Sequence, residues 1–311
     1  MVIVVILGVL AIRHKYEQIS DRFITHTNQV SQGITKEMKL TAQYLETLSQ
    51  SSDFTDFLND SNSVDKKKRA QKLFISTITR SPSYDQVRYI DETGYEVIRV
   101  NSRDNKVEIV PENFHQQKNN RYYFTDTMKL KKGEVYLSPL DLNIEQGKIE
   151  IPHVPTIRMS MPVFDTHGNK RGILIVNYRA SEILNHLTAP DKLTDYVSTF
   201  LVNSDGYWIK GPSPESEWGF MFSDKQNEKF EKYFPLSNKM IADSDDGDLI
   251  NKEGVFFWVK FFPIEDIRPK YDTGNPHLFY YSRYLATKDF HLTIVAHSTI
   301  QQMVKYLFTF D

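Results

Sequence analysis

One local pattern occurs three times in the chain and constrains its fold more than any other feature. An apolar, strand-like run ends at Asp or Asn, two residues follow, and a glycine then leads into another apolar run, at residues 91–94, 165–168 and 203–206. Asp and Asn side chains accept hydrogen bonds from the backbone that follows them, and glycine readily adopts the positive φ that closes a hairpin. The pattern therefore predicts three tight turns between antiparallel strands.

The spacing of these turns predicts two sheets in tandem. The first and third copies lie 112 residues apart, and each opens a new strand-rich stretch. A short helical piece within residues 181–195 ends at Pro190 and separates the two stretches. We expect two modules of similar design, the first over residues 82–190 and the second over residues 191–300.

A long helix is predicted ahead of the sheets. Residues 15–59 contain no proline and one glycine, and apolar residues recur at spacings that are mostly three, four or seven. These apolar positions are Ile19, Phe23, Val30, Ile34, Met38, Ala42, Leu45 and Leu48. A break is expected around Asp53 and Asp56, and a second helix from Asp65 to the residues before Pro82. The expected fold class is therefore α+β, with a long N-terminal helix followed by two antiparallel-sheet modules.

Both ends of the chain are apolar. Residues 2–12 form an unbroken apolar run of about eleven residues, shorter than the ~20 that cross a bilayer as a helix, and basic residues follow it. We expect residues 1–12 to be the outer part of a transmembrane helix, with a buried strand or core helix as the alternative. Residues 13–81 would then form a stalk helix and a second helix. Residues 301–311 turn apolar and aromatic and are expected to begin a second membrane segment.

Composition excludes several classes of function. Charges nearly balance, with 38 Lys and Arg against 40 Asp and Glu, so there is no positive field to attract nucleic acid. The absence of cysteine excludes disulfides and thiolate chemistry. Nine scattered histidines lack metal-ligand spacing, and the acidic run at residues 243–248 places its glycine too early for an EF-hand, so we expect a solvated loop there. We expect no metal, no other cofactor and no catalytic residues, because phosphate-binding loops and nucleophile elbows are also missing from the sequence.

The ordered series of strand and turn motifs resembles the double Cache sensor domain of bacterial transmembrane receptors, most like those of sensor histidine kinases or diguanylate cyclases. The segments that carry the resemblance are residues 121–124, 133–138, 140–143, 147–152, 155–158, 162–165, 172–177, 200–206 and 217–221. The likeness extends from the first helix to the last strand. It implies two PAS-like sheets behind a membrane-proximal helix, with the ligand held in the first, membrane-distal module.

The resemblance also implies a set of ligand-binding positions. In similar proteins the pocket lies between the central sheet of the distal module and the loops that cross it. The matching positions are Arg121, Tyr122, Tyr123, Tyr136, Ser138, Asp141, Asn143 and Arg158. The denser Tyr, Trp and Asp signature of amine-sensing members is missing from the sequence, which argues against an amino-acid ligand.

Arg158 has the clearest chemistry of these positions. Apolar and polar residues alternate along residues 156–163, which places Arg158 on the polar face of a strand. Its planar guanidinium suits a carboxylate or phosphate, so a small anion is a reasonable ligand. An internal pair with Asp141 or Glu150, or an exposed sheet edge, would explain it as well, and Arg99 has the same ambiguity.

Two further expectations concern Arg158 and the adjacent residues Tyr122 and Tyr123. We expect Arg158→Ala to remove stabilisation by the ligand while leaving the fold intact. We also expect Tyr122 and Tyr123 to lie on a strand, so that at most one of them faces the pocket.

These features predict an extracytoplasmic ligand-sensing domain of a receptor in the bacterial inner membrane, with this region in the periplasm or extracellular space. Ligand binding would shift an equilibrium between two arrangements, and the helix from Arg13 and the segment after Ser298 would relay it. A homodimer through the long helix fits this mechanism. The alternatives are a membrane-anchored solute-binding module without signalling output, a chemotaxis receptor sensor, and an extracytoplasmic enzyme.

Overall fold

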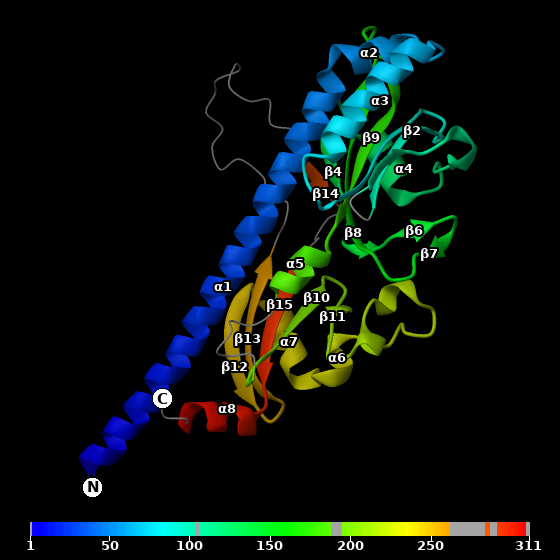
Figure 1. Ribbon diagram of the computed structural model, residues 1–311. Helices are drawn as coiled ribbons and strands as arrows, with labels where there is room; N and C mark the ends of the chain where they lie inside the picture. Colours follow the sequence, from blue (N-terminus) through cyan, green and yellow to red (C-terminus); the bar gives the residue numbers. More distant parts are fainter. Residues whose placement is uncertain (1, 104–105, 188–194, 262–283, 287–290, 309–311) are drawn as a thin grey trace. The chain divides into compact units, whose positions relative to one another are not determined.

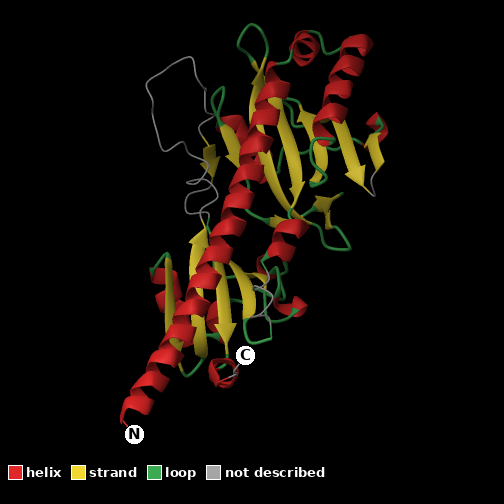
Figure 2. Ribbon diagram, turned by 60° about the vertical axis from the view of Figure 1, so that its left-hand side comes forward, coloured by secondary structure: helices red, strands yellow, loops and turns green. Residues whose placement is uncertain are grey.

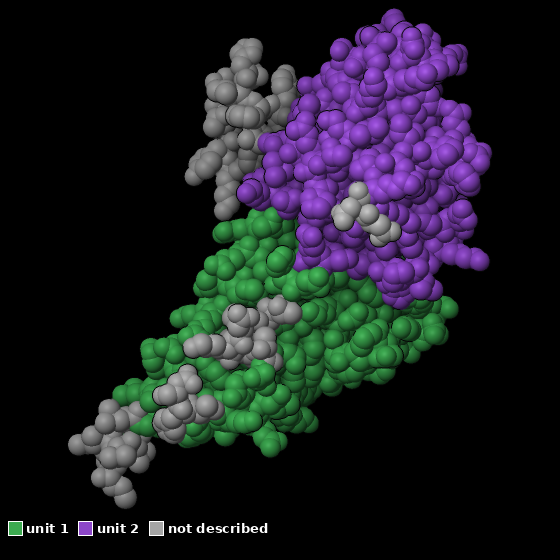
Figure 3. Space-filling model, in the orientation of Figure 1, with its two compact units in different colours: residues 1–34, 183–263, 289–311 green, residues 35–182, 264–288 purple. Residues whose placement is uncertain are grey.

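The computed structural model divides the 311-residue chain into two compact units (Figure 3). Unit 1 comprises residues 1–34, 183–263 and 289–311, and unit 2 comprises residues 35–182 and 264–288. The structure describes residues 2–103, 106–187, 195–261, 284–286 and 291–308. The sequence also predicts a loop over residues 265–277, which are rich in Pro, Gly, Asp and Lys. This segment and residues 188–194 of the expected join between modules lie outside the described residues.

Helix α1 spans Val2–Gln50 (Figure 1). Seven of the eight apolar positions in the predicted stripe are buried and Val30 is half-buried, which confirms a single amphipathic helix. The apolar run at residues 2–12 continues the same helix, and Ile6, Val9 and Leu10 are exposed. In the described part of the chain, we find no helix with both the length and the apolar character required to cross a bilayer.

The helix breaks at Ser51, two residues before the predicted region around Asp53 and Asp56. The side chain of Ser51 accepts the Phe54 backbone N–H at 3.3 Å and begins α2, Ser52–Asn59. In the same way, Ser63 caps α3, Val64–Ile78. Both predictions, a break after the long helix and a second helix before Pro82, are confirmed.

Unit 2 is built on one large sheet. Its strands are β1 (Tyr84–Ile90), β2 (Glu96–Arg103), β3 (Lys106–Ile109), β4 (Val135–Leu137), β5 (Asp141–Leu142), β8 (Pro155–Phe164), β9 (Lys170–Arg179) and β14 (Tyr284–Ala286). Their order is β14-β4-β8-β9-β1-β2-β3, with β5 beside β8, and every pairing is antiparallel except β14 with β4. Strands β6 (Ile144–Glu145) and β7 (Lys148–Ile149) form a separate hairpin.

Helices pack on this sheet (Figure 2), and different side chains cover its two faces. On one face, Tyr89 of β1 packs edge-on against Phe54 and Phe57 of α2, with ring centroids 5.4 and 5.9 Å apart. On the other face, Ile90 belongs to an apolar cluster with residues of α4, Tyr122–Lys129, and the short helix η1, Glu112–Phe114, lies in the segment that leads to α4. Successive strand residues point to opposite faces, so the apolar layer under α2 leaves the central residues of the second face free to be polar.

Unit 1 repeats this design with a five-stranded antiparallel sheet. Its order is β11-β10-β15-β13-β12, from β10 (Ser198–Asn203), β11 (Trp208–Lys210), β12 (Asp246–Asn251), β13 (Gly254–Phe261) and β15 (Leu292–Ser298). Phe257 of β13 packs against Phe23 of α1, whereas its neighbours Phe256 and Trp258 join a core with Phe230. The remaining helices are α5 (Ser181–His186), η2 (Pro214–Ser216), η3 (Gly219–Met221), α6 (Phe230–Tyr233), α7 (Pro235–Asp243) and α8 (Ile300–Phe308). The acidic run at residues 243–248, expected to be a loop, instead leads from the end of α7 into β12 and is a loop only between them.

The three predicted turns share one geometry. The backbone N–H of Gly94, Gly168 and Gly206 donates to the carbonyl three residues earlier, at 3.0, 3.1 and 2.9 Å. All three glycines have φ between 81° and 86°, and each preceding Asp or Asn side chain accepts two backbone N–H groups beyond it. The turns at residues 91–94 and 203–206 join the corresponding strand pairs β1-β2 and β10-β11. The predicted α+β fold with two tandem antiparallel-sheet modules is confirmed.

Candidate ligand-binding site

A row of polar side chains crosses the centre of the unit 2 sheet. Asn101 of β2 lies opposite Gln86 of β1, Gln86 lies opposite Asn177 of β9, and Asn177 lies opposite Arg158 of β8. All four residues are buried. Because buried polar groups are costly unless hydrogen-bonded, this row requires partners from the segments that cover it.

The side-chain partners of Arg158 lie on the segments that cover this face of the sheet. Its guanidinium forms an ion pair with Asp141 and donates to the Tyr122 hydroxyl at 3.3 Å and to Asn143 Oδ1 at 3.2 Å. Its backbone N–H donates to Ser138 Oγ at 2.8 Å. Burial alone would lower the pKa of Arg158, but the Asp141 carboxylate and Tyr122 raise it above the ordinary value, so the side chain remains charged.

These contacts decide among the structural roles that the sequence left open for Arg158. The residue is 1% exposed and lies on β8, which has strands on both sides, so it is not at an exposed edge. Its internal partner is Asp141, whereas Glu150 pairs with Arg103 at 2.7 Å. The guanidinium of Arg158 already has an ion pair and hydrogen bonds within the protein, so a ligand that reached it would contact a group whose partners are in place.

The expectation of a strand at Tyr122 and Tyr123 is wrong. Both residues lie in the first turn of α4, and both are directed into the cluster. The Tyr122 hydroxyl donates to Asp141 at 2.7 Å, and the Tyr123 ring lies 5.4 Å from the Arg158 guanidinium carbon and 5.7 Å from that of Arg88. Neighbouring helix residues point about 100° apart rather than in opposite directions, so both can face the sheet.

The other predicted positions lie in the same region. Tyr136 is buried in the apolar cluster with Tyr123, and Arg121 precedes α4 with its guanidinium carbon 5.7 Å from the Tyr123 ring centroid. Ser138 and Asn143 contact Arg158 as described above. The structure therefore brings all eight predicted positions into one part of unit 2.

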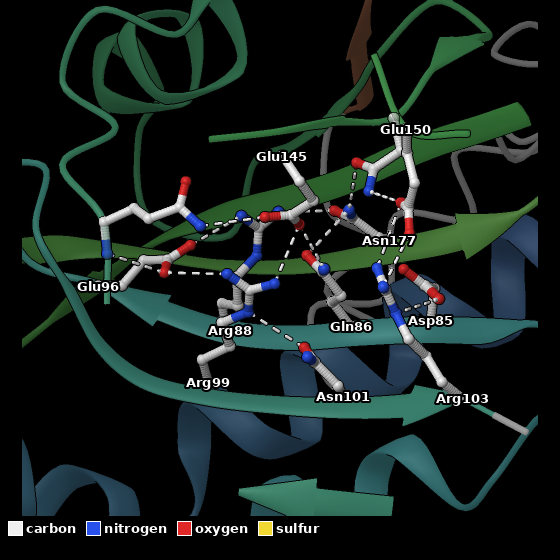
Figure 4. A network of polar contacts seen from close by, with 12 residues as sticks. Asp85, Gln86, Arg88, Glu96, Arg99, Asn101, Arg103, Glu145, Glu150 and Asn177 are labelled. Atoms are coloured by element: carbon white, nitrogen blue, oxygen red, sulfur yellow. Dashed lines mark hydrogen bonds and ion pairs between the residues drawn. The ribbon is translucent and has the colours of Figure 1, made fainter. Parts of the chain in front are cut away.

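A second group of charged residues, which the sequence reasoning largely missed, continues this cluster (Figure 4). Arg88 and Arg99 lie directly opposite each other on β1 and β2, and both donate to the fully buried Glu96, at 3.1 and 3.4 Å. Arg88 also donates to Asn177 at 2.7 Å, which connects this group to the polar row. The turn at residues 91–94 sets this register, so the sequence already implied two facing arginines that need a shared acceptor.

Glu145 is the outer acceptor of the group. It accepts hydrogen bonds from Arg99 at 3.0 Å, from Gln86 at 2.7 Å and from the Gln116 side chain at 3.0 Å. Burial alone would raise the pKa of Glu145, but Arg99, the Gln86 hydrogen bond and Arg88 lower it to about 2. The carboxylate is therefore ionised at neutral pH.

The cluster carries one more cation than carboxylate. Its cations are Arg88, Arg99, Arg103, Lys118, Arg158 and Arg179, and its carboxylates are Asp85, Glu96, Asp141, Glu145 and Glu150. Lys118 is 6% exposed and donates to the neutral Gln116 side chain at 2.8 Å. Burial and the neighbouring Arg88 lower the pKa of Lys118. A surplus positive charge in a buried cluster favours an anion nearby.

A cavity of about 340 Å³ lies against the outer end of the cluster. Its lining is polar at Arg99, Asn101, Glu108, Gln116, Glu145 and Gln146 and apolar at Val110, Pro111 and Phe114. This volume is at the lower end of the ~300–1,000 Å³ typical of small-molecule pockets. Across the described residues there is no group of His, Asp and Glu side chains that could hold a metal ion.

Tandem antiparallel sheets that follow a long helix form the fold that the sequence led us to expect of an extracytoplasmic sensor domain. Residues 20–267 match the family described as bacterial histidine kinase, sensor domain, and the chain belongs to this family. The sensor domains of this family are non-catalytic. No curated protein matches the chain.

Solved structures with the same fold come from several receptor types. A putative sensory box/GGDEF family protein domain from Vibrio parahaemolyticus superposes with a TM-score of 0.74 at 15% identity, covering 93% of this chain and 98% of that one. The extracellular domain of the putative histidine kinase vpHK1S-Z8 gives 0.69 at 16% identity, covering 97% and 96%. The ligand-binding domain of the Campylobacter jejuni chemoreceptor Tlp3, in complex with L-norvaline, gives 0.55 at 10% identity, covering 96% and 94%.

Proposed function

We propose that unit 2 is the membrane-distal, ligand-binding module of a receptor in the bacterial inner membrane, and that unit 1 is the membrane-proximal module. The observation that carries this proposal is the surplus of positive charge beside a cavity in unit 2. Sheet faces that need no ligand are normally filled with apolar side chains, so a buried cluster of this size is a functional candidate.

The ligand that we propose is a small anion that enters through the cavity. The cavity offers Arg99 and amide groups at one end and Val110, Pro111 and Phe114 at the other. The eight positions from the resemblance are not in the lining of this cavity and would lie behind it, in the cluster around Arg158: Arg121, Tyr122, Tyr123, Tyr136, Ser138, Asp141, Asn143 and Arg158. The Tlp3 domain is solved with L-norvaline, which combines a carboxylate with a short apolar chain, so amino acids also belong among the compounds to be tested.

The receptor that we propose is a sensor histidine kinase, which is the type that the family describes. A diguanylate cyclase and a chemotaxis receptor are the other candidate receptor types, because a GGDEF family protein domain and a chemoreceptor domain have the same fold. The apolar start of α1 and the end of α8 would continue into the membrane, and ligand binding would be relayed along them. Paired α1 helices in a homodimer would provide the moving element.

Thermal melting of the whole chain against a panel of small solutes tests this proposal. Carboxylates, phosphate, amino acids, amines and neutral sugars are compared at matched ionic strength. At least one anion should raise the melting temperature saturably by several degrees, since a ligand at 100 times its Kd adds about 2.7 kcal/mol.

A pair of arginine variants locates the effect. Arg99→Gln should lose the stabilisation, whereas Arg69→Gln, which removes a surface pair with Asp53, should keep it. Stabilisation by amines or sugars alone, or equal responses of the two variants, would contradict the proposal.

A further inference from the structure

We propose that Glu145 occupies a carboxylate-binding cradle in unit 2 and that the carboxylate of a small, singly charged ligand replaces it there. The inference rests on the proposed function and gives that site a ligand class and a switch. The cradle is the set of three side chains Gln86, Arg99 and Gln116, whose donors converge on the Glu145 carboxylate.

The cradle has the properties of a built anion site. Its three donors come from β1, from β2 and from the segment before α4, and they lie 2.7, 3.0 and 3.0 Å from the carboxylate oxygens. Other residues hold them in place: Asn101 and Glu96 bind Arg99, and Asn177 donates to Gln86. The donors therefore remain positioned if the carboxylate leaves.

Glu145, whose carboxylate fills the cradle, lies on a small element. Glu145 belongs to the β6-β7 hairpin, which has two residue pairs and, among the strands that the structure describes, no ladder to the large sheet. The hairpin turns at Gln146 and Gly147 with φ of 48° and 78°, and a glutamine at positive φ is uncommon. The base of the hairpin is tied down by Glu150, which pairs with Arg103 at 2.7 Å. The tip can therefore withdraw while its base stays fixed.

The cavity defines the ligand that can compete with Glu145. A carboxylate in the cradle would direct the rest of the ligand towards Val110, Pro111 and Phe114, and Phe114 is 58% exposed. Glu108 on the wall and the displaced Glu145 would repel a second negative charge. The ligand class is therefore a monocarboxylate with a short apolar body.

Chemical rescue with propionate tests this inference, because propionate reproduces the Glu145 side chain. In the whole chain, Glu145→Ala should lower the melting temperature, and propionate should raise it again by several degrees relative to chloride at equal ionic strength. The wild type should respond less, because Glu145 competes for the cradle. The double variant Glu145→Ala/Arg99→Gln should not respond.

Matched controls keep the test falsifiable. Glu108→Ala removes an exposed carboxylate from the same cavity and should gain much less propionate response than Glu145→Ala, because Glu145 still occupies the cradle. If Glu145→Ala does not fold, Glu145→Gln keeps the size of the side chain and should still respond more than the wild type, because an amide binds Arg99 more weakly than a carboxylate does. The inference is overturned if a Glu145 variant responds to propionate no more than the wild type does. It is also overturned if Glu108→Ala responds as strongly as Glu145→Ala.

The outcome separates this inference from the proposed function. If a panel compound stabilises the wild type through Arg99 but propionate does not rescue Glu145→Ala, the cradle exchange fails and the sensor proposal stands. If propionate rescues the variant and no compound stabilises the wild type, the exchange site exists and the sensor proposal loses its support.

Discussion

The buried pair of Arg158 and Asp141 determines what a substitution at Arg158 does. The sequence led us to expect that Arg158→Ala would leave the fold intact. With both side chains inside the sheet face, removing the arginine leaves a buried carboxylate without its cation. Breaking such a pair costs about 3–5 kcal/mol.

We therefore predict that Arg158→Ala lowers the free energy of unfolding by about 3–5 kcal/mol, measured by urea denaturation. Replacing both partners, as Arg158→Met with Asp141→Leu, should cost less than the single change, because no unpaired charge remains. A single variant as stable as the wild type would show that the pair contributes little.

Glu145 should make stability depend on pH. Its pKa is lowered from the ordinary 4.5 to about 2 in the folded chain, so the folded state binds the proton more weakly than the unfolded state. The stabilisation is complete above about pH 4.5 and is lost as the pH falls towards 2, and it amounts to about 3 kcal/mol.

We predict that Glu145→Gln is less stable than the wild type at pH 7 and that the difference shrinks between pH 4.5 and pH 2, measured by urea unfolding across this range. Glu108→Gln, whose side chain is exposed, should track the wild type. A Glu145→Gln deficit that does not change with pH would mean that charge is not the cause.

Among the elements, the turn at residues 91–94 supports the site. The Gly94 carbonyl accepts the Lys118 backbone N–H at 2.7 Å, which fixes the segment that carries Gln116. A Cβ on Gly94 would lie 2.6 Å from the Asn119 backbone, whereas a Cβ on Gly168 in the equivalent turn would meet nothing within 4 Å. The two turns share their backbone geometry and differ in what covers the glycine.

We predict that Gly168→Ala costs about 1–2 kcal/mol, the cost of a left-handed alanine, and that Gly94→Ala costs clearly more. Urea denaturation gives both values. Gly94→Ala should also weaken binding of any anion found in unit 2, and equal costs for the two variants would contradict the role given to Asn119.

What the sequence could predict at this scale was local. The turns, a break near Asp53 and the apolar stripe of α1 follow from neighbouring residues; the turns and the stripe are confirmed, and the break lies two residues earlier, at Ser51. The first turn of α4 was misread because its tyrosines favour strands, and packing against the sheet overrode that preference. The acceptors Glu96 and Glu145 were missed because their partners lie on other elements.

For the whole molecule, the antiparallel order of the two sheets could be expected from the repeated turns, but long-range pairings could not. The parallel pairing of β14 with β4 joins residues about 150 positions apart, and no local pattern marks it. The candidate site shows the same limit: the eight predicted positions share one region, yet the cavity is lined by Arg99 and eight other residues outside that set.

We propose that the chain senses a small anion through the charged face of unit 2. Hydrogen–deuterium exchange of the whole chain, with and without the anion that most raises its melting temperature, tests this claim most directly. Slower exchange should concentrate in β2, in residues 110–117 and in the β6-β7 hairpin, where the cavity lies. Slower exchange confined to unit 1, or none in these three segments, would contradict the account.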